Sequence, residues 1–539
     1  MKKISYLIGL LIEVVVLGII YYFTLPAMNL HSTGFWAFVV FALVMFGFIN
    51  AIINSTATVK RIIRTKGKEL EIKAFSTLIP FVIAGVIVVG SLIVNFFCGP
   101  FFNAKGYATR IVVDETGDFT KDIAEVDFSK LPLLDRDSSE KLGDRVMGQM
   151  SEFVSQYYVS NQYTQINYNN DIIRVTPLEY ADFIKWISNR KSGVKGYITV
   201  NSVDGSAELV KLDKGMKYMP SAYFNDNVYR KLRFAYPTAV FGDIKFEIDN
   251  EGKPYWIAPT YSFIGVEMKT KVTGVVILDA VTGKSKKYKI EDVPTWVDNA
   301  YNADLIIEQV NDWGTYREGF INSIFGQKNV VNTTQGYNYL AMNDDVYLYT
   351  GITSVLSDES NLGFILSNMR TGETIFYSVP GAEEYSAMAS AEGQVQQMSY
   401  NSTFPLLINL NNKPTYLVSL KDAAGLVKMY GFIDVEDYQK VVVTDASNGI
   451  NVAAQNYLNK YAEEITEDML ETETVVIKRI TTAIKGGNTY YYITGENNKK
   501  YKLSITLGDE LAFLSVGDSI KVGHYETSSE IIEVVKLIK

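Results

Sequence analysis

The chain has 539 residues, which is too long for a single hydrophobic core and predicts two to four domains. Apolar residues make up 47% and charged residues 21%, so the composition excludes disordered and collagen-like chains. A single Cys excludes an intramolecular disulfide framework. Two His leave little room for His-based catalysis or for metal sites with several His ligands.

Three apolar segments open the chain, at Ile4–Leu25, Gly34–Ile53 and Thr77–Cys98. Each has about the 20 residues that a helix needs to cross the hydrocarbon layer, and Glu13 is the one charged residue within them. The first segment is too long for a signal peptide, lacks a small-residue cleavage pattern and is followed by two more spans. Residues 1–99 are therefore predicted to form a transmembrane anchor of three helices.

The positions of Lys and Arg predict the orientation of the anchor. Lys2 and Lys3 precede the first segment, whereas Pro26–Thr33, between the first two segments, carries no Lys or Arg. Six basic residues separate the second and third segments: Lys60, Arg61, Arg64, Lys66, Lys68 and Lys73. The N-terminus is thus expected in the cytoplasm of a multi-pass plasma-membrane protein, with residues 99–539 outside.

The expected outer part is acidic and contains no Cys after position 98. It holds 43 Lys and Arg against 57 Asp and Glu, a net charge of −14, which repels phosphate backbones and argues against a nucleic-acid partner. A Cys-free exterior is typical of an envelope without routine disulfide formation, such as a Gram-positive one. Cys98 is interpreted as an ordinary helix-end residue, with acylation as the alternative.

Residues 100–192 are expected to form a linker and an α+β adaptor. Tyr107–Val113 alternates like a strand, and Ser139–Ser160 and Pro177–Asn189 have helical patterns. Thr176-Pro177-Leu178-Glu179 has the spacing of a capping box, with Thr as N-cap and Glu three residues later, and predicts the start of the second helix.

Residues 193–465 contain a repeat. Three segments align without gaps, Gly196–Gly205, Gly274–Gly283 and Gly363–Gly372, and each continues into a second alternating run, which predicts a β-hairpin. Each hairpin is followed by a Pro, a segment with helical character and another strand pair. The helical segments are Ser221–Leu232, Ala303–Ile324 and Ala382–Met398, and the strand pairs lie around Phe246–Tyr261, Tyr337–Thr353 and Leu406–Leu420. The prediction is three hairpin–helix–hairpin units, with a fourth hairpin beginning at Gly431.

Residues 466–539 read as a separate small β-barrel. Five short alternating runs with one helical insertion at Glu510–Leu514 are typical of an OB-like barrel. The whole chain is therefore assigned to the α+β class, with three membrane helices, repeated hairpin units and a terminal barrel.

The repeated segments resemble a known family. Gly274–Ile290 and Gly363–Val379, with the turn Asp279-Ala280-Val281-Thr282-Gly283, are similar to the strand-turn-strand signature of PepSY-type domains. The resemblance implies small extracytoplasmic α+β modules, often regulatory or inhibitory and often close to membrane anchors or peptidases. It carries over no catalytic residues.

No motif assigns a reaction, a cofactor or a metal. The sequence contains no H-E-x-x-H, phosphate-binding loop or nucleophile elbow, and His31 and His524 are interpreted as surface or packing residues. A hydrolase with paired carboxylates would need only Asp and Glu, but nothing in the sequence selects a pair. Asp249-Asn250-Glu251-Gly252 and Asn343-Asp344-Asp345 offer oxygen ligands for Ca²⁺, but such residues are also typical of hairpin turns.

A few residues are candidates for contacts. Glu13 and Asn50 are polar residues within the spans and are interpreted as contacts of the helix bundle, with a proton or ion relay by Glu13 as the alternative. Aromatic residues could present rings to a glycan or protein, although packing within strands is the favoured interpretation. They are Tyr255, Trp256, Tyr490, Tyr491 and Tyr492.

The sequence favours a non-enzymatic scaffold or interaction protein of the bacterial cell envelope. Its expected partners are the lipid bilayer and envelope proteins or further copies of the chain, with a glycan as another candidate. Two alternatives stay open: an extracytoplasmic sensor or regulator of a peptidase, and a carboxylate-dependent hydrolase of envelope glycans.

Overall fold

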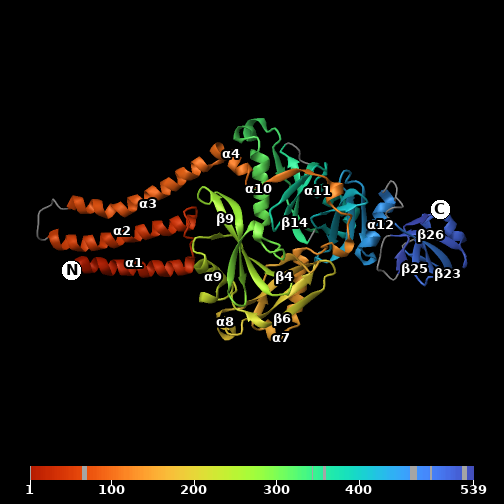
Figure 1. Cartoon of the computed structure of the whole chain (residues 1–539), viewed down its shortest axis with the longest axis horizontal. Coiled ribbons are helices and arrows are strands. Elements are labelled where there is room, and N and C mark those ends of the chain that lie inside the picture. The colour runs from red at the N-terminus through yellow and green to blue at the C-terminus, as the bar shows by residue number, and fades with distance from the viewer. Residues whose placement is uncertain are drawn as a thin grey trace.

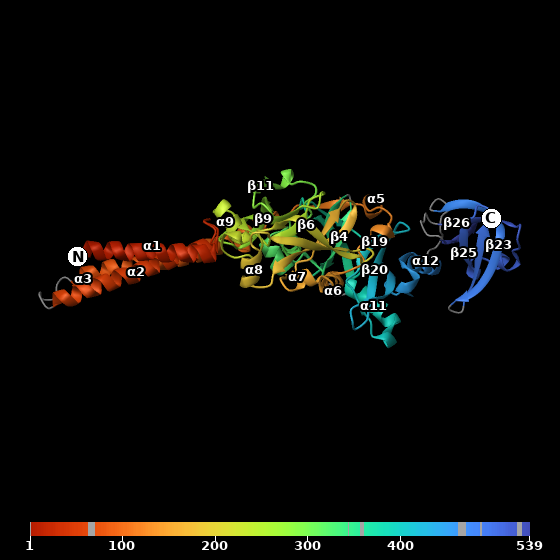
Figure 2. The same cartoon turned by 90° about the horizontal axis from the view of Figure 1, so that it is seen from below.

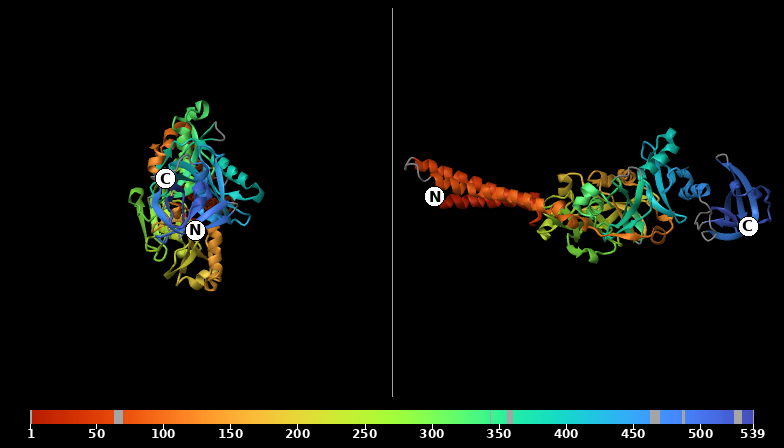
Figure 3. Two further views of the ribbon diagram at one scale, coloured as in Figure 1. Left: turned by 90° about the vertical axis from the view of Figure 1, so that its right-hand side faces the viewer. Right: turned by 90° about the horizontal axis from the view of Figure 1, so that it is seen from above.

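The computed structural model describes residues 2–62, 70–342, 344–355, 360–461, 470–485, 488–524 and 531–538. The molecule is elongated, with three long helices at one end and a small sheet near the C-terminus at the other (Figures 1 and 2). Between them lies a part rich in β-strands, residues 100–461, which we call the head. The same outline is seen from above (Figure 3).

The three long helices are α1 (Lys2–Thr24), α2 (Thr33–Ile62) and α3 (Leu70–Cys98). Their segments Ile4–Thr24, Thr33–Asn54 and Thr77–Cys98 are long and apolar enough to cross a membrane, as the sequence predicts. Glycines let the helices approach closely, because a Cβ at Gly9 or Gly47 would lie under 3 Å from the side chains of Ile49 or Phe81. The side chains of the basic residues at positions 60–73 lie outside the described residues, so orientation stays a prediction.

Helices and strands alternate in the head, which confirms the mixed α+β class. The head contains four sheets with the same connectivity. In each, two short strands pair in turn with the same edge of a long strand. The other edge of that strand pairs with a second long strand, and the second long strand pairs with an outer strand.

The first two sheets contain the following strands. The first sheet has β2 (Tyr157–Val159), β3 (Thr164–Tyr168), β4 (Asp171–Tyr180), β5 (Val194–Asn201) and β6 (Ala207–Met216). The second sheet has β7 (Val240–Phe241), β8 (Lys245–Ile248), β9 (Pro254–Ile264), β10 (Lys269–Asp279) and β11 (Ser285–Lys289).

The other two sheets of the head follow the same order. The third has β12 (Val331–Thr333), β13 (Asn338–Met342), β14 (Asp345–Ser354), β15 (Ser360–Asn368) and β16 (Thr374–Tyr377), and is extended by β1 (Val113–Gly117) and β17 (Gly381–Ala382). The fourth has β18 (Asn401–Ser402), β19 (Leu406–Leu410), β20 (Lys413–Lys421), β21 (Val427–Asp434) and β22 (Val441–Asp445).

A helix precedes each of these sheets in the chain. These helices are α6 (Arg136–Gly148), α9 (Val228–Ala235), α10 (Ala303–Tyr316) and α11 (Glu384–Gln394). The remaining helices are α4 (Pro100–Ala108), α5 (Phe119–Asp122), α7 (Ser151–Val154), α8 (Phe183–Asn189) and α12 (Ile450–Tyr461).

The hairpin turns of the four sheets are built alike. Asn201, Asp279, Asn368 and Asp434 end the second long strand of their sheets, and each side-chain oxygen accepts hydrogen bonds from the main-chain N–H groups two and three residues later. Asn and Asp favour this turn because their short side chains reach the following backbone. The hairpins predicted at Gly196, Gly274 and Gly363 are present, and the one starting at Gly431 completes a fourth sheet.

The sheets share hydrophobic cores in pairs. One cluster of buried side chains joins the first two sheets and includes Trp186, Ile198, Phe246 and Trp256. A second cluster joins the third and fourth sheets. Strands β3 and β14 are in contact, so the two pairs also meet. The head is therefore one continuous row of sheets.

The last sheet, residues 471–538, has its own core around Val475, Ile493 and Leu503. Its strands are β23 (Glu471–Lys485), β24 (Asn488–Gly495), β25 (Lys500–Ser504), β26 (Ser519–His524), β27 (Ile531–Glu533) and β28 (Lys536–Ile538). The long strand β23 pairs with β24 along one half and with β26 along the other. β27 runs parallel to β25, and β28 runs antiparallel to β26.

Several local predictions are wrong. Thr176–Glu179 lies in β4 instead of capping a helix, because the Thr176 hydroxyl donates to the Ser160 carbonyl and Glu179 accepts the N–H of Ser221. Helix α8 begins later, at Phe183, with Asp182 as its N-cap.

Two boundaries also differ from the expected ranges. The segment Tyr107–Val113 is expected from the sequence to be a strand. Tyr107 and Ala108 instead form the end of helix α4, and β1 starts only at Val113. The first sheet begins at Tyr157, because β2 and β3 pair with β4, and β4 pairs with β5 of the first repeated hairpin. The sheet therefore includes much of the range expected to be an adaptor.

Candidate functional site

A cleft of about 900 Å³ lies between the first and second sheets. One wall comes from strands β3 to β6, and the other comes from the β8–β9 turn and the β10–β11 turn. A cleft of this size is typical of a site for a small molecule or for a short segment of another chain. It is the candidate binding site of the head.

Hydrogen bonds hold the floor of the cleft in place. Tyr197 is buried, and its hydroxyl donates to the carbonyl oxygen of Gly252 at 2.9 Å. Gly252 has a φ of +76°, which favours glycine, and a Cβ there would lie 3.2 Å from the Tyr197 hydroxyl. Asp249 closes the same turn by accepting the N–H groups of Glu251 and Lys253. Its carboxylate is therefore used in a hairpin turn, which favours that interpretation over a Ca²⁺ ligand.

The rim of the cleft carries both signs of charge. The exposed side chains Glu208, Lys211, Asp213 and Lys214 come from β6, and Glu251 and Lys253 come from the opposite turn. β6 is the outermost strand of its sheet in the strand order. The arrangement can hold a polar or mixed-charge ligand, and the outer strand offers main-chain groups to an extended one.

Two arginines of the head bind the end of the first membrane helix. Arg230 Nε donates to the carbonyl of Tyr22 at 3.0 Å, and Arg233 Nε donates to the carbonyl of Leu25 at 2.9 Å. The guanidinium of Arg230 also lies 4.2 Å from the centre of the Tyr22 ring. Carbonyl groups at the C-terminal end of a helix lack partners within the helix and favour cations, so α9 caps α1.

The ends of the other two membrane helices are also held by the second sheet. Glu267, in the β9–β10 turn, accepts hydrogen bonds from the hydroxyls of Ser32 and Thr33 at the start of α2. Asn95, near the end of α3, exchanges hydrogen bonds with the main chain of Val266. His31 Nδ1 lies 2.8 Å from the carbonyl oxygen of Gly265, so this exposed His adds a polar contact to the junction.

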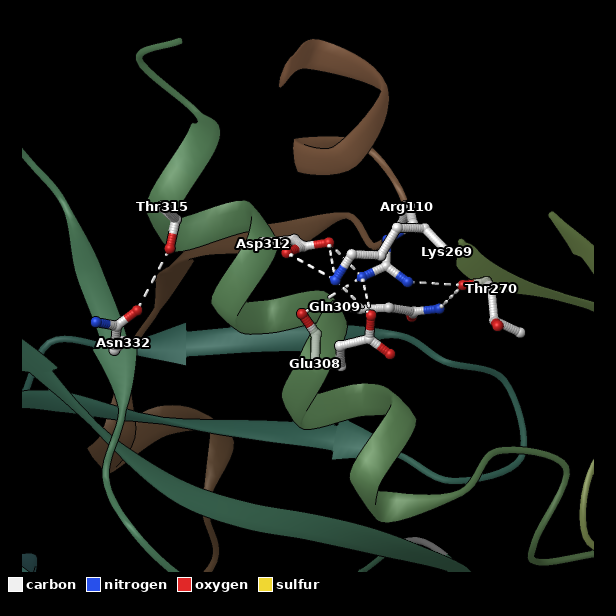
Figure 4. A network of polar contacts seen from close by, with 8 residues as sticks. All are labelled: Arg110, Lys269, Thr270, Glu308, Gln309, Asp312, Thr315 and Asn332. Carbon is white, nitrogen blue, oxygen red and sulfur yellow. Dashed lines mark hydrogen bonds and ion pairs between the residues drawn. The ribbon is translucent and has the colours of Figure 1, made fainter. Parts of the chain in front are cut away.

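A further polar cluster holds the first segment of the head, after α3, to the rest of the head (Figure 4). Arg110 is buried and pairs with Asp312 at 2.5 Å and with Glu308 at 3.3 Å, both on α10. Lys269 on β10 pairs with the same two carboxylates, and Arg110 also donates to the carbonyl of Thr270. This cluster ties α4, α10 and β10 together beside the membrane helices. No sequence motif pointed to Arg110, although it is the first Arg after the third span.

The polar residues of the spans form a cluster across all three helices. The Tyr6 hydroxyl of α1 lies 2.9 Å from Asn50 Oδ1 and 3.1 Å from Asn54 Oδ1 on α2, and Asn54 Nδ2 donates to Thr77 on α3. Asn50 is therefore a bundle contact. Glu13 is also buried, and its Oε2 has no hydrogen-bond partner among the described residues.

The aromatic candidates fall into two groups. Trp256 is fully buried and donates to the carbonyl of Tyr218, so it is part of the core. Tyr255 packs against Trp296 with 5.0 Å between ring centres, and burial together with nearby Asp249 raises the pKa of Tyr255 to about 12. In the last sheet Tyr491 is buried, whereas Tyr490 and Tyr492 are half-buried on the other face. Tyr490 lies under Lys502 at 4.5 Å.

A pair of buried carboxyls joins the first two sheets. Glu247 on β8 accepts the N–H groups of Asp298 and Asn299, and Asp298 accepts the N–H of Asn167 on β3. Burial raises the pKa of Glu247 to about 7, and burial with the nearby Glu247 charge raises the pKa of Asp298 well above its usual value. Both side chains are enclosed by protein, so they cannot touch a substrate.

Titratable clusters elsewhere are structural. His524 is buried in the last sheet, where its Nε2 lies 3.1 Å from Glu473, which also accepts from Tyr501 and Lys499. Asp345 is held by Arg370 and Asn368, and Asn343 lies outside the described residues. Within the described ranges, no group of three or more His, Cys, Asp or Glu could hold a metal ion.

Comparison with known proteins gives no family. No family model matches the chain, and no curated protein does. Among solved structures, a crystal structure of an ACO/RPE65 chimera aligns at 8% identity over 70% of this chain, with a TM-score of 0.14. The chain spans 65% of the length of that structure, and a likeness this low carries no argument about fold or function.

Proposed function

We propose that the chain is a non-enzymatic, membrane-anchored scaffold or interaction protein of the bacterial cell envelope. The observation that carries this proposal is the set of polar contacts that hold the head to the ends of all three long apolar helices, through Arg230, Arg233, Glu267 and Asn95. Such a junction resists rotation of the head on its anchor, so binding surfaces along the row of sheets stay at fixed heights above the bilayer.

The topology within this proposal places the N-terminus in the cytoplasm and residues 99–539 outside, because the basic residues flank the cytoplasmic ends of the spans. A membrane-impermeant maleimide tests it in a Cys98→Ser background. A cysteine at exposed Phe513 should react in intact cells. A cysteine at Lys3 should react only after permeabilisation, and the reverse pattern would overturn the topology.

The four head units are proposed to be PepSY-like, and the last sheet OB-like. The recurring helix followed by an antiparallel sheet with an Asn or Asp turn supports the first assignment. The strand order supports the second assignment. The long strand β23 pairs with both β24 and β26, and the last two strands, β27 and β28, pair with β25 and β26 respectively.

Partner capture tests the scaffold role. Cells that make the full chain, and matched cells that make only residues 1–99, are cross-linked, extracted in mild detergent and analysed by mass spectrometry. Envelope proteins, or further copies of the chain, should be enriched with the full chain alone. Recovery of nothing beyond the bait in both samples would count against the proposal.

The cleft between the first two sheets favours a second candidate, a regulator that binds an extended peptide segment, such as one from a peptidase. A photo-cross-linker at Lys211, on the outer strand of the cleft, should capture a ligand that the same group at exposed Lys287 does not. Equal capture at the two positions would remove this candidate. A glycan hydrolase is not proposed, because the carboxyls whose pKa burial raises most, Glu247 and Asp298, lie outside the cleft and inside the core.

A further inference from the structure

An exposed apolar patch lies on the side of the head next to the membrane helices. Helix α8 presents Phe183, Ile184 and Ile187 to the outside, with Ile184 63% and Ile187 47% exposed, while Trp186 on its other side is buried. Tyr223 and Phe224 are exposed and contact the ring of Phe183. Contiguous exposed apolar groups on a folded domain mark a surface that meets another phase or molecule.

A hydrogen bond beside this patch, which we call rim A (Phe183, Ile184, Ile187, Tyr223 and Phe224), connects it to the end of the first span. The Tyr22 hydroxyl in the last turn of α1 donates to Asn225, the neighbour of Phe224, at 3.0 Å. The Tyr22 ring lies 6.0 Å from that of Phe234 on α9. Rim A therefore continues directly from a residue that lies at the end of a membrane span.

A second apolar patch, rim B, follows the end of the third span. Phe101 and Phe102 are exposed in the first turn of α4, within four residues of Cys98 at the end of α3. The ring of Phe101 contacts that of Phe320 at 5.4 Å, and the adjoining segment exposes Ile321, Ile324 and Phe325, the last of these at 81%. Gly99, which is extended, separates the two helices, so Phe101 and Phe102 follow the end of the span by only three and four residues.

Both rims lie at the same end of the head. Helices α4, α8 and α9 lie at the end from which the membrane helices leave, on different sides of the bundle (Figures 1 and 2). Basic side chains accompany both rims: Lys185 and Lys191 at α8, and Lys105 and Lys328 beside rim B. The nearby carboxylate Asp226 is paired with Arg190.

We infer that rims A and B are immersed in the interfacial layer of the outer leaflet, so that the head rests on lipid on two sides of its anchor. Aromatic and aliphatic side chains with flanking Lys match this layer, where rings and alkyl groups enter the acyl boundary and ammonium groups meet phosphates. A bilayer is the occupant because the spans themselves hold both rims at its surface. The inference rests on the membrane anchor of the proposed function.

The test uses the full chain, purified and reconstituted into vesicles of phosphatidylglycerol and phosphatidylcholine. In a Cys98→Ser background, one cysteine is introduced at Ile184, Phe325, Phe513 or Val86 and labelled with an environment-sensitive fluorophore. All four positions are exposed on the protein surface, so labelling leaves the core untouched. Phe513 in the last sheet is the control for water, and Val86 in α3 is the control for lipid.

We expect the labels at 184 and 325 to be quenched by doxyl groups placed high on the lipid acyl chains and to be several-fold less sensitive to aqueous iodide than the label at 513. Labels at 184 and 325 that behave like the one at 513, while the label at 86 is quenched by lipid, would overturn the inference and leave the anchor standing. Labels protected from iodide but not quenched by lipid would indicate a protein contact and would also overturn it. A label at 86 that lipid does not quench would refute the anchor itself.

Discussion

Arg233 Nε donates a hydrogen bond to the main-chain carbonyl of Leu25, a residue 208 positions earlier in the chain. Arg233 is buried on α9, and Leu25 follows α1 with a φ of +50°, a left-handed conformation that frees its carbonyl from the helix. The same guanidinium donates to the carbonyl of Ala239 at 2.5 Å. One side chain of the head thus completes the end of a membrane helix.

Replacing this side chain should loosen the junction. We expect Arg233→Ala to lower the free energy of unfolding by about 3 kcal/mol, because two partly buried carbonyls lose a charged donor. The change is measured by denaturant unfolding in detergent micelles. Arg145→Ala, at an exposed position of α6, should change stability by less than about 0.5 kcal/mol, and equal effects of the two variants would contradict the role of Arg233.

The cluster around Arg110 gives a second prediction. Arg110→Met should destabilise the head by roughly 3 kcal/mol, because the poorly exposed Asp312 carboxylate keeps only Lys269. The double variant Arg110→Met with Asp312→Leu should recover part of the loss, since no unpaired charge remains buried. In the exposed pair of Lys289 and Glu291, Glu291→Gln should change stability far less than Arg110→Met does. A double variant less stable than Arg110→Met would be the opposite result.

The buried Glu247 predicts a dependence of stability on pH. Its pKa is about 7 in the folded chain against 4.5 when solvated, so between these values the folded state binds more protons than the unfolded state. The contribution of Glu247 to the free energy of unfolding therefore falls as pH rises through this window and is constant above it.

The groups near Glu247 are Asp298, which shifts with it, and Lys245, which favours its ionised form. In Glu247→Gln, stability should fall less steeply between about pH 5 and pH 7 than in the parent chain. The slope is obtained from urea midpoints at several pH values. Replacing the carboxyl by an amide also changes stability by an amount that does not depend on pH, and this amount does not affect the slope. Identical slopes in the two proteins would show that Glu247 does not titrate in this range.

Replacing two glycines by alanine should change the stability of the chain in opposite directions. A Cβ at Gly363, on β15, would lie 2.1 Å from the carbonyl oxygen of Tyr377 on the neighbouring strand, so Gly363→Ala should destabilise the third sheet by roughly 2 kcal/mol. Gly393 lies inside α11 with no atom within 4 Å of such a Cβ, and Gly393→Ala should stabilise by roughly 1 kcal/mol. Thermal unfolding of both variants checks the contrast. A stabilised Gly363→Ala would mean that the two strands separate easily.

The sequence predicts those features that depend on local patterns. The three apolar helices follow from span length, and the hairpins at Gly196, Gly274 and Gly363 follow from alternation and turn residues. Thr176-Pro177-Leu178-Glu179 misleads because a capping box and a strand with tertiary partners for Thr176 and Glu179 look the same in the sequence. Such partners arise only on folding.

Less of the candidate site than of the fold could be predicted from the sequence. The cleft depends on how two sheets meet across Tyr197 and Gly252, which lie 55 residues apart. Arg230 and Arg233 belong to no sequence motif. Basic residues on a short helix such as α9 are ordinarily expected to face solvent. Of the contact candidates, Asn50 lies in the helix bundle and Trp256 lies in the core, which the residue types alone did not distinguish.

The cap on α1 has a consequence for the order in which the molecule matures. Helix α1 is made before the head, because Arg230 and Arg233 follow the residues they bind by more than 200 positions. Until both arginines have been made and α9 has formed, the carbonyls of Tyr22 and Leu25 lack these donors. Helix α1 therefore forms early and is completed late, and a chain interrupted before position 230 carries an unfinished first helix.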